Sequence, residues 1–482
     1  MTPSIVFGVI GGYFSLLMLI AYITSRQLDR ESFYTANKQS PWYIVAFGMI
    51  GASLSGVTFI SVPGEVSNSQ WAYFQMVLGY LVGYFVIAQV LLPLYYRLNL
   101  VSIYQYLDSR YGVRAYRTGA GFFLLSRVIG ASFRLYLVAV VLQTAFFDAF
   151  EVPFAVSVVV TIMLIWLYTF KGGIKTILWT DTLQTFFMLL AVVLTIFIIK
   201  DALDLRVTQL WTVIHDSDYS NIFVWDGKLP LNFYKQFISG AFMAIVMTGL
   251  DHDMMQKNLT CRSLNDAKKN VFWFSIVLVI ANLLFLSLGA LLFIYGEANQ
   301  IDLGSVTDKV YPYLAMNHLG IFAGIVFLLG VTAAAYSSAD SALTALTTSF
   351  IVDIQGKAPQ TVGNPHRVVV HLAFSVLIAV VILIFEALND QSVINTLFKV
   401  AGYTYGPLLG LYSFGLFTKH QPNDRWIPLV CLAAPLLAYV LNANSVDWLG
   451  GYQFGFELLL VNGLLTFVGL WFIKTKQVNY TA

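Results

Sequence analysis

Charged residues are scarce in this chain of 482 residues: only 11% are Asp, Glu, Lys or Arg, against about 25% in ordinary soluble domains. Hydrophobic residues make up 58% of the chain, and its mean hydropathy is +0.74. A soluble domain of this composition would expose far too much apolar surface to water. The composition therefore excludes a soluble domain and predicts a polytopic membrane protein.

Cysteine and histidine are also rare. The two cysteines, Cys261 and Cys431, are too few for a disulfide framework or a thiolate metal site. The histidines show no metal-ligand spacing, and they are His215, His252, His318, His366, His371 and His420. A net charge of +2, with basic residues spread through short loops, gives no indication of a nucleic-acid partner. We expect neither an enzyme nor a nucleic-acid-binding protein.

Long apolar segments follow one another along the whole chain. A transmembrane helix needs about 20 mostly apolar residues, and thirteen segments qualify: near 5–24, 42–66, 71–95, 118–148, 152–170, 176–199, 232–254, 270–295, 320–349, 367–387, 391–417, 426–442 and 452–473. Arg26 and Arg30 follow the first segment and no basic residue precedes it, which is the reverse of a signal peptide. The first segment is therefore predicted to span the membrane with its N-terminus outside.

Lysine and arginine are concentrated in alternate loops. Basic residues of short loops stay on the cytoplasmic side. With the N-terminus outside, the cytoplasmic loops hold Arg26, Arg30, Lys38, Arg97, Arg110, Arg114, Arg117, Lys171, Lys175, Lys257, Arg262, Lys268, Lys269, Lys357, Arg367, Lys419, Arg425, Lys474 and Lys476. The outer loops hold Lys200, Arg206, Lys228, Lys235 and Lys309. The C-terminus is predicted to be cytoplasmic. Arg127, Arg134 and Lys399 fall inside predicted helices, where each needs a partner or a water path.

Two spanning segments contain small and polar residues that favour a broken helix. They are GMIGASLSGVTFISVPGE at 48–65 and SGAFMAIVMTGLDHD at 239–253, in the second and seventh predicted spans. Broken helices at matching places of two five-helix halves indicate an inverted-repeat secondary transporter, which holds ion and solute near the membrane midplane. The alternative is that the small residues only allow close helix packing.

The segment near 320–349 carries a cluster of oxygen-bearing side chains. Within VTAAAYSSADSALTALTTSF, Ser337 and Ser341 share a helix face, Ser338 lies beside them and Asp340 follows closely. Hydroxyls and carboxylates are hard ligands that suit an alkali cation. Lone serines often bond only to the carbonyl four residues earlier, but an ionised aspartate at mid-membrane costs about 2.5–3.5 kcal/mol. A cation site is therefore predicted here.

A further aspartate, Asp181, lies in YTFKGGIKTILWTDTLQTFFML at 168–189. It follows a polar turn and sits where lipid would be expected. Either it faces the protein interior and a cation, or it caps its helix near the cytoplasmic surface. The residues alone leave both interpretations open.

Three motifs resemble the sodium:solute symporter family, and the resemblance covers nearly the whole chain. One resembles the family signature and consists of Tyr168, Thr169, Gly172, Gly173, Lys175, Trp179, Thr180, Asp181 and Gln184. AAAYSSADSALT resembles the family's sodium-binding eighth core helix. DMMQKNLTCRSLNDAKKN at 253–270 resembles the loop after the sixth core helix, with Gln256 in its usual place.

The resemblance implies an all-α polytopic membrane protein of leucine-transporter type (LeuT-like), with two inverted repeats of five helices. An N-terminal extra helix and loop would occupy 1–41, and the first repeat 42–200. An extracellular loop would follow at 201–231, and the second repeat at 232–417. Two further helices and a short cytoplasmic tail would complete the chain at 418–482. It also implies sodium-coupled uptake of a small solute by alternating access across a lipid bilayer, which we expect to be a bacterial inner membrane.

The resemblance also implies where sodium binds. One sodium ion would be held by the carbonyls of Gly51, Leu54 and Ala334 and by the hydroxyls of Ser337 and Ser338. Some relatives bind a second sodium, whose ligands would fall on Asp181, Ser337, Asp340 and Ser341. Asp340 replaces a hydroxyl residue of those relatives, so two carboxylates would meet one cation or share a proton. Proton coupling stays open as an alternative.

Substrate contacts implied by the resemblance lie beside the first broken helix. They are Ser53, Ser55 and Thr58. Val62 to Glu65 resembles the iodide, monocarboxylate and vitamin branch, and Thr58 to Pro63 resembles the sialic acid branch. Both favour a small organic anion. The arginine that binds the sialic acid carboxylate would fall on Gly130, and Arg127 one turn away is expected to substitute for it.

The role of Lys399 and several alternative functions stay open from the sequence. Lys399 either meets an anionic solute or forms a structural contact. Sodium-coupled sugar or amino-acid uptake is an alternative within the family, and a channel or a membrane-embedded enzyme is an alternative of another class.

Overall fold

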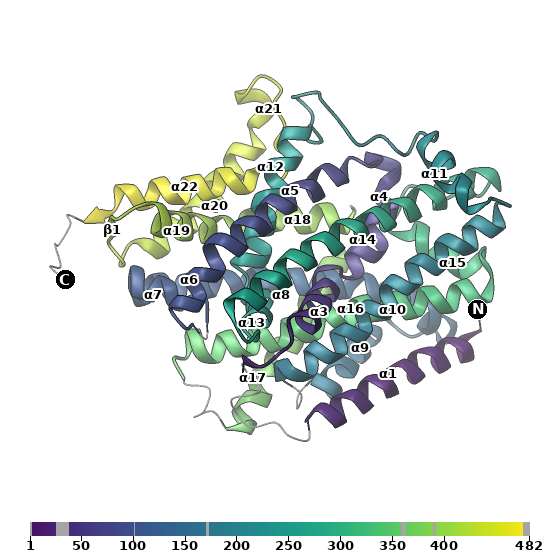
Figure 1. The fold of residues 1–482 in the computed structure, drawn as a ribbon, viewed down its shortest axis with the longest axis horizontal. Coiled ribbons are helices and arrows are strands. Elements are labelled where there is room, and N and C mark those ends of the chain that lie inside the picture. The colour runs from purple at the N-terminus through teal and green to yellow at the C-terminus, as the bar shows by residue number, and fades with distance from the viewer. Residues whose placement is uncertain are drawn as a thin grey trace.

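The computed structural model describes residues 2–25, 38–100, 102–169, 173–357, 363–388 and 392–475, and these are mostly helical (Figure 1). The α-helices before the second break are α1 Pro3–Ser25, α3 Trp42–Ser53, α4 Gly56–Ser69, α5 Tyr73–Val86, α6 Leu92–Arg97, α7 Gln105–Arg110, α8 Val113–Leu142, α9 Phe154–Thr169, α10 Gly173–Ala202, α11 Val207–His215 and α12 Phe233–Ala244. Those after it are α13 His252–Asn258, α14 Leu264–Ala298, α15 Val310–Asn317, α16 Gly320–Ser349, α17 Asn364–Leu388, α18 Val393–Thr404, α19 Gly406–Phe417, α20 Ile427–Ala443, α21 Ser445–Trp448 and α22 Leu458–Phe472.

Short irregular elements complete the described chain. Four π-helical turns extend longer helices: η2 Ile87–Leu91, η3 Gln143–Phe147, η5 Ile245–Gly249 and η7 Phe350–Ile354. Two 3₁₀ turns are η4 Asp148–Phe150 and η6 Thr307–Lys309, and β1 Gln421–Pro422 pairs antiparallel with β2 Lys474–Thr475. Several residues used in the sequence predictions lie outside the described residues: Arg26, Arg30, Lys171, Gly172 and Lys476.

Seven helices in the described ranges are long and apolar enough to cross a membrane, or up to nine when each bent pair counts as one span. Four shorter apolar helices, α9, α19, α20 and α22, coincide with further predicted segments. In Figure 1, α20 and α22 lie at the end of the molecule away from α1. The number of thirteen spans stays a prediction.

Both predicted helix breaks are confirmed. The axes of α3 and α4 differ by 56°, and Ser55 between them is extended. The axes of Phe233–Gly249 and α13 differ by 70°. Asp251 begins α13, because its side chain accepts a hydrogen bond from the Met254 amide at 3.2 Å. Small residues, and at the second break the Asp251 cap, therefore let the chain leave helical geometry inside the protein, where neighbouring groups satisfy the backbone.

Helix α16 forms the centre of the molecule. Every residue from Gly330 to Ser349 is buried, and the helix packs against α3, α4, α8 and α10. Burial on all sides explains why this helix contains small residues and serines throughout. The polar groups of α16 consequently face other helices, with lipid excluded.

Two glycines let α5 and α12 approach closely. A Cβ at Gly79 would overlap the carbonyl oxygen of Phe237, and one at Gly240 would overlap the carbonyl oxygen of Met76. Both obstacles are backbone atoms, so a side-chain shift cannot relieve them. The contact therefore depends on the absence of a side chain at both positions.

We expect Gly240→Ala to lower the free energy of unfolding by about 1–3 kcal/mol, because the added methyl group forces the two backbones apart. Thermal unfolding of the purified protein in detergent measures the effect. Gly121→Ala is the matched control, since nothing lies within 4 Å of a Cβ at Gly121. Equal melting temperatures of the two variants would contradict the close contact.

Candidate ion and substrate sites

The first helix break meets α16 at a cluster of oxygen atoms. The Ser337 hydroxyl donates to the Gly51 carbonyl at 2.8 Å and approaches the Ala334 carbonyl at 3.3 Å. The Ser338 hydroxyl also donates to the Ala334 carbonyl, at 3.3 Å. Leu54 lies at the end of α3, where the helix stops. The structure therefore brings together four of the five predicted sodium ligands, with the fifth at the adjoining break.

Helix α10 closes this cluster from the other side. A Cβ at Gly51 would overlap the Thr185 hydroxyl, so α3 and α10 are in close contact. Thr185 donates to the carbonyls of Phe47 at 2.9 Å and Asp181 at 2.7 Å. Carbonyl and hydroxyl oxygens gathered away from lipid are the ligand types that a hard cation prefers. The cluster therefore suits sodium.

An inner cavity of about 70 Å³ lies beside the first break. Its lining includes Ser53, Ser55, Thr58 and Arg127, which are the four predicted substrate contacts. The second broken helix contributes Met243, Met247, Thr248 and Met254. Both breaks thus face one cavity.

Two arginines of α8 line the inner cavity, and their surroundings differ. Arg127 is buried, forms an ion pair with Asp253 and lies 3.9 Å from Asp251. Arg134 is also buried, but its Nε and Nη1 atoms have no hydrogen-bond partner among the described residues. The carbonyl of Arg134 lies beside Gly56 at the start of α4. Among the described residues Arg127 Nε also lacks a hydrogen-bond partner, so Arg134 differs in having two unpartnered donors and no ion pair.

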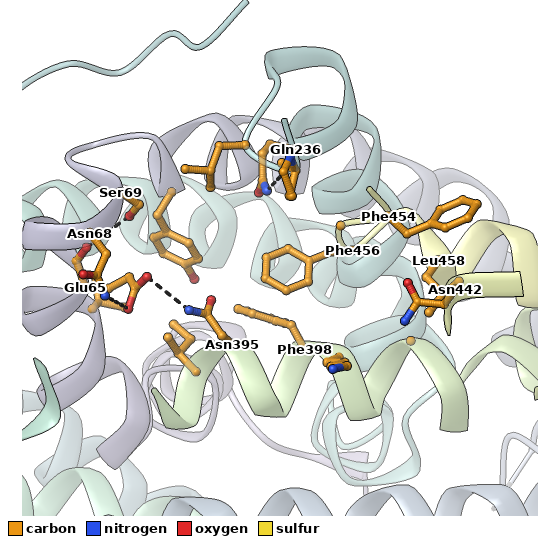
Figure 2. Close-up of a pocket in the computed structure, with 18 of the residues that line it drawn as sticks. Glu65, Asn68, Ser69, Gln236, Asn395, Phe398, Asn442, Phe454, Phe456 and Leu458 are labelled. Atoms are coloured by element: carbon orange, nitrogen blue, oxygen red, sulfur yellow. Dashed lines mark hydrogen bonds between the residues drawn. The ribbon is translucent and has the colours of Figure 1, made fainter. Parts of the chain in front are cut away.

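Figure 2 shows residues that line a second, outer cavity of about 510 Å³. Tyr73, Ile394 and Phe398 line both cavities, so these side chains separate them. In the outer cavity the Asn395 amide donates to Glu65 at 3.1 Å, and the exposed Lys399 contributes to the lining. A solute entering from this side would pass these polar groups before it reached the inner cavity.

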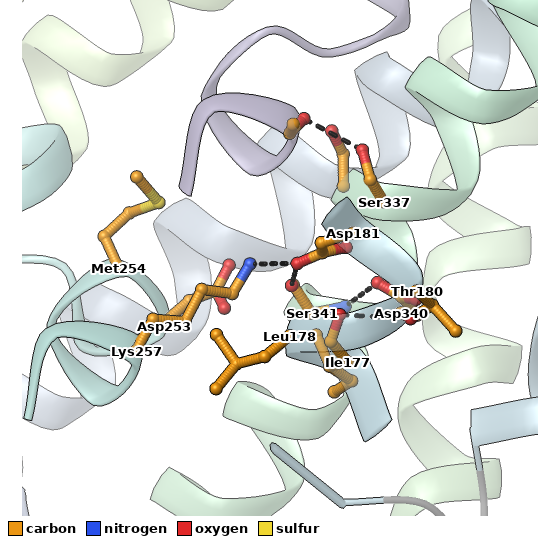
Figure 3. A network of polar contacts seen from close by, with 12 residues as sticks. Ile177, Leu178, Thr180, Asp181, Asp253, Met254, Lys257, Ser337, Asp340 and Ser341 are labelled. Atoms are coloured by element: carbon orange, nitrogen blue, oxygen red, sulfur yellow. Dashed lines mark hydrogen bonds and ion pairs between the residues drawn. The ribbon is translucent and has the colours of Figure 1, made fainter. Parts of the chain in front are cut away.

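Asp181 belongs to a buried ion pair (Figure 3). The Lys257 ammonium lies 2.7 Å from Asp181 Oδ2, and both side chains are fully buried. The Ser341 hydroxyl donates to the same oxygen at 3.4 Å. Asp340 is buried as well, and its Oδ1 accepts from the Ser341 amide at 2.5 Å. Asp181 therefore faces the interior, and the interpretation as a surface cap is wrong.

Sequence reasoning placed Lys257 in a cytoplasmic loop, and this placement is wrong. Lys257 lies in α13 and is fully buried. The ion pairs of Arg127 were missed too. The available signal was the cluster of Asp251, Asp253 and Lys257 directly after a predicted break, because charges inside a membrane segment need partners.

Two broken helices that face a common cavity beside a buried oxygen cluster define an ion-coupled secondary transporter. The chain belongs to the sodium:solute symporter family, whose model matches residues 33–423. It is thus an integral membrane protein that couples movement of a small solute to sodium, as the sequence predicted. Membership also points to a protein that transports its solute without converting it.

The relatives cover most of the chain at low identity. The sodium/sialic acid symporter NanT of Aliivibrio fischeri is 23% identical over 94% of this chain and 91% of its own. The sodium/sialic acid symporter SiaT of Proteus mirabilis is 24% identical over 86% and 84%. The human sodium/iodide cotransporter is 23% identical over 84% and 65%.

Solved structures support the fold. A Na⁺-coupled sialic acid symporter in a substrate-bound outward-open state matches with a TM-score of 0.82 and 20% identity, over 96% of both chains. Mhp1, a transporter of the nucleobase-cation-symport-1 family, matches with a TM-score of 0.55 and 15% identity, over 92% of this chain and 94% of its own. The predicted leucine-transporter type of fold is confirmed.

Proposed function

We propose that this protein imports a small organic anion, such as a monocarboxylate, a sugar acid or a vitamin-like acid, together with sodium. The observation that carries the proposal is the buried Arg134 guanidinium in the inner cavity, whose Nε and Nη1 atoms have no hydrogen-bond partner in the described part of the chain. A guanidinium presents N–H groups in a planar fork that matches a carboxylate. A neutral sugar would supply no charged acceptor for these two N–H groups.

The position of the sodium cluster supports coupling between ion and anion. Gly51 and Leu54 belong to the predicted sodium ligands, and Ser53, Ser55 and Thr58 of the same segment line the inner cavity. Sodium that binds the carbonyls at this break would order the same segment that contacts the solute. This shared segment is a physical route by which one ligand favours binding of the other.

The inner cavity has to enlarge during transport. Sites for small molecules usually measure about 300–1,000 Å³, whereas this cavity measures about 70 Å³. Tyr73 and Phe398 stand between the cavities, with ring centroids 6.3 Å apart. We propose that these two rings move apart to admit the solute from the outer cavity, and that inward rocking of the broken helices then releases solute and sodium.

The bounds of the two repeats and the orientation of the chain in the membrane are part of the same proposal. The repeats would occupy 42–200 and 232–417, since each begins with one of the two broken helices. The outer cavity, which includes Pro230 and Leu231, would face outside, and the basic loops would face the cytoplasm of a bacterial inner membrane.

Melting temperatures in sodium and in potassium at equal ionic strength test the proposal. A ligand that binds only the folded protein stabilises it by about 2.7 kcal/mol at a hundredfold excess over its Kd. We expect a saturable rise with sodium alone, and a further rise with a small organic anion only when sodium is present. A rise with neutral sugars and none with anions would contradict the substrate class, and equal curves in both salts would contradict sodium binding.

A further inference from the structure

The ion pair between Asp181 and Lys257 lies directly beside the sodium cluster. Ser337 contributes its hydroxyl to the sodium cluster, and Ser341, one turn further along α16, donates to Asp181 Oδ2. Figure 3 shows Lys257 reaching from α13 toward this same oxygen, at 2.7 Å. The ammonium thus pairs with Oδ2 of an aspartate that the family resemblance assigned to a second sodium, while Oδ1 has no hydrogen-bond partner among the described residues.

The backbone around Lys257 holds its side chain in this place. Helix α13 begins at the cap of Asp251 after the 70° bend. At the other end, Thr260 donates to the Lys257 carbonyl at 2.7 Å, and Asn270 donates to the Asn258 side chain at 2.6 Å. Because both ends of this short helix are bonded, the backbone holds the ammonium beside Asp181 in this structure.

An ammonium can replace a sodium ion in charge. It carries one positive charge on a compact group that donates up to three hydrogen bonds. Unlike sodium, it stays attached to the chain and cannot be carried across the membrane. A fixed cation here would balance the charge of Asp181 in every state of the cycle in which the two side chains stay paired.

We propose that Lys257 is a built-in cation that replaces a second sodium ion, so that each transport cycle carries one sodium. This inference rests on the proposed function, because it needs the sodium cluster at Gly51, Ser337 and Ser338. For a singly charged anion, one sodium makes the cycle electrically neutral. The membrane potential would then not drive accumulation of such a solute.

Equilibrium binding of radioactive sodium to the purified protein tests the inference. We expect one sodium per chain in the natural protein. Lys257→Gln removes the fixed cation and leaves Asp181 unpaired, so this variant should bind two sodium ions. The Hill coefficient for sodium-dependent stabilisation should rise from about one to about two. Lys269→Gln, at an exposed position of α14, is the matched control and should keep one.

A double variant keeps the test decisive if Lys257→Gln does not fold. Lys257→Gln with Asp181→Asn removes both charges, and we expect it to bind one sodium with the affinity of the natural protein. Two sodium ions in the natural protein, one in Lys257→Gln, or weakened binding in the double variant would each overturn the inference. Absence of sodium binding from the natural protein would instead refute the sodium cluster and the proposed function.

Discussion

Ser338→Ala is expected to weaken sodium binding by about 10–150-fold, since an interaction between a hydroxyl and a charged group contributes about 1.5–3 kcal/mol. The variant removes one of the five proposed oxygen ligands and leaves the carbonyls of the cluster in place. The sodium concentration at half-maximal stabilisation and at half-maximal uptake would both rise. Melting curves over a sodium series, followed by uptake into vesicles, measure the two effects.

A second serine gives the control for this experiment. Ser287→Ala removes a hydroxyl that bonds only to the Leu283 carbonyl, at 2.8 Å, within its own helix α14. It makes the same chemical change away from the cluster and should leave sodium affinity unchanged. If Ser338→Ala also leaves it unchanged, the sodium ligands have been assigned to the wrong residues.

Arg134→Met should lower the affinity for the anionic solute by about 30-fold or more, because loss of one partner of a buried charge pair costs about 2–5 kcal/mol. Stabilisation by sodium alone should persist in this variant, since Arg134 does not belong to the sodium cluster. Solute-dependent stabilisation in saturating sodium measures the loss. Arg134→Lys keeps the charge without the planar fork and is expected to be intermediate.

Variants of two further arginines test which arginine of α8 binds the solute. Arg117→Met alters an exposed residue of the same helix α8 and should have no effect on solute affinity. Arg127→Met leaves Asp253 buried without its partner, so it should lower the melting temperature. If Arg127→Met stays folded and loses solute binding while Arg134→Met retains it, then Arg127 is the solute ligand, as the sequence predicted.

Local sequence predicted much of the architecture correctly. Apolar segments predicted the membrane class because a spanning helix must be apolar over its whole length. The breaks were predictable since small and polar residues such as those at 51–56 interrupt a helix wherever other groups satisfy its backbone. The spacing of Ser337, Ser338 and Ser341 predicted a common region of one helix, because helical periodicity is a property of the sequence.

Pairing between distant elements was not predictable in the same way. Lys257 and Asp181 are 76 positions apart, and Arg127 and Asp253 are 126 apart. No periodicity relates such positions, so a single sequence could not show that Asp181 already has a cationic partner. The same holds for Arg134, whose Nε and Nη1 atoms have no hydrogen-bond partner among the described residues only because of how the helices pack.

The amino-acid sequence by itself determined the membrane class, the two broken helices and the oxygen-bearing residues that suit sodium. These properties depend on composition and on the period of one helix. Tertiary structure decided which charges meet. It paired Asp181 with Lys257 and Arg127 with Asp253, and it left two N–H groups of Arg134 in the cavity without a hydrogen-bond partner among the described residues. The physical reason is that a buried charge is stable only beside its partner, and only the folded chain brings the partners together.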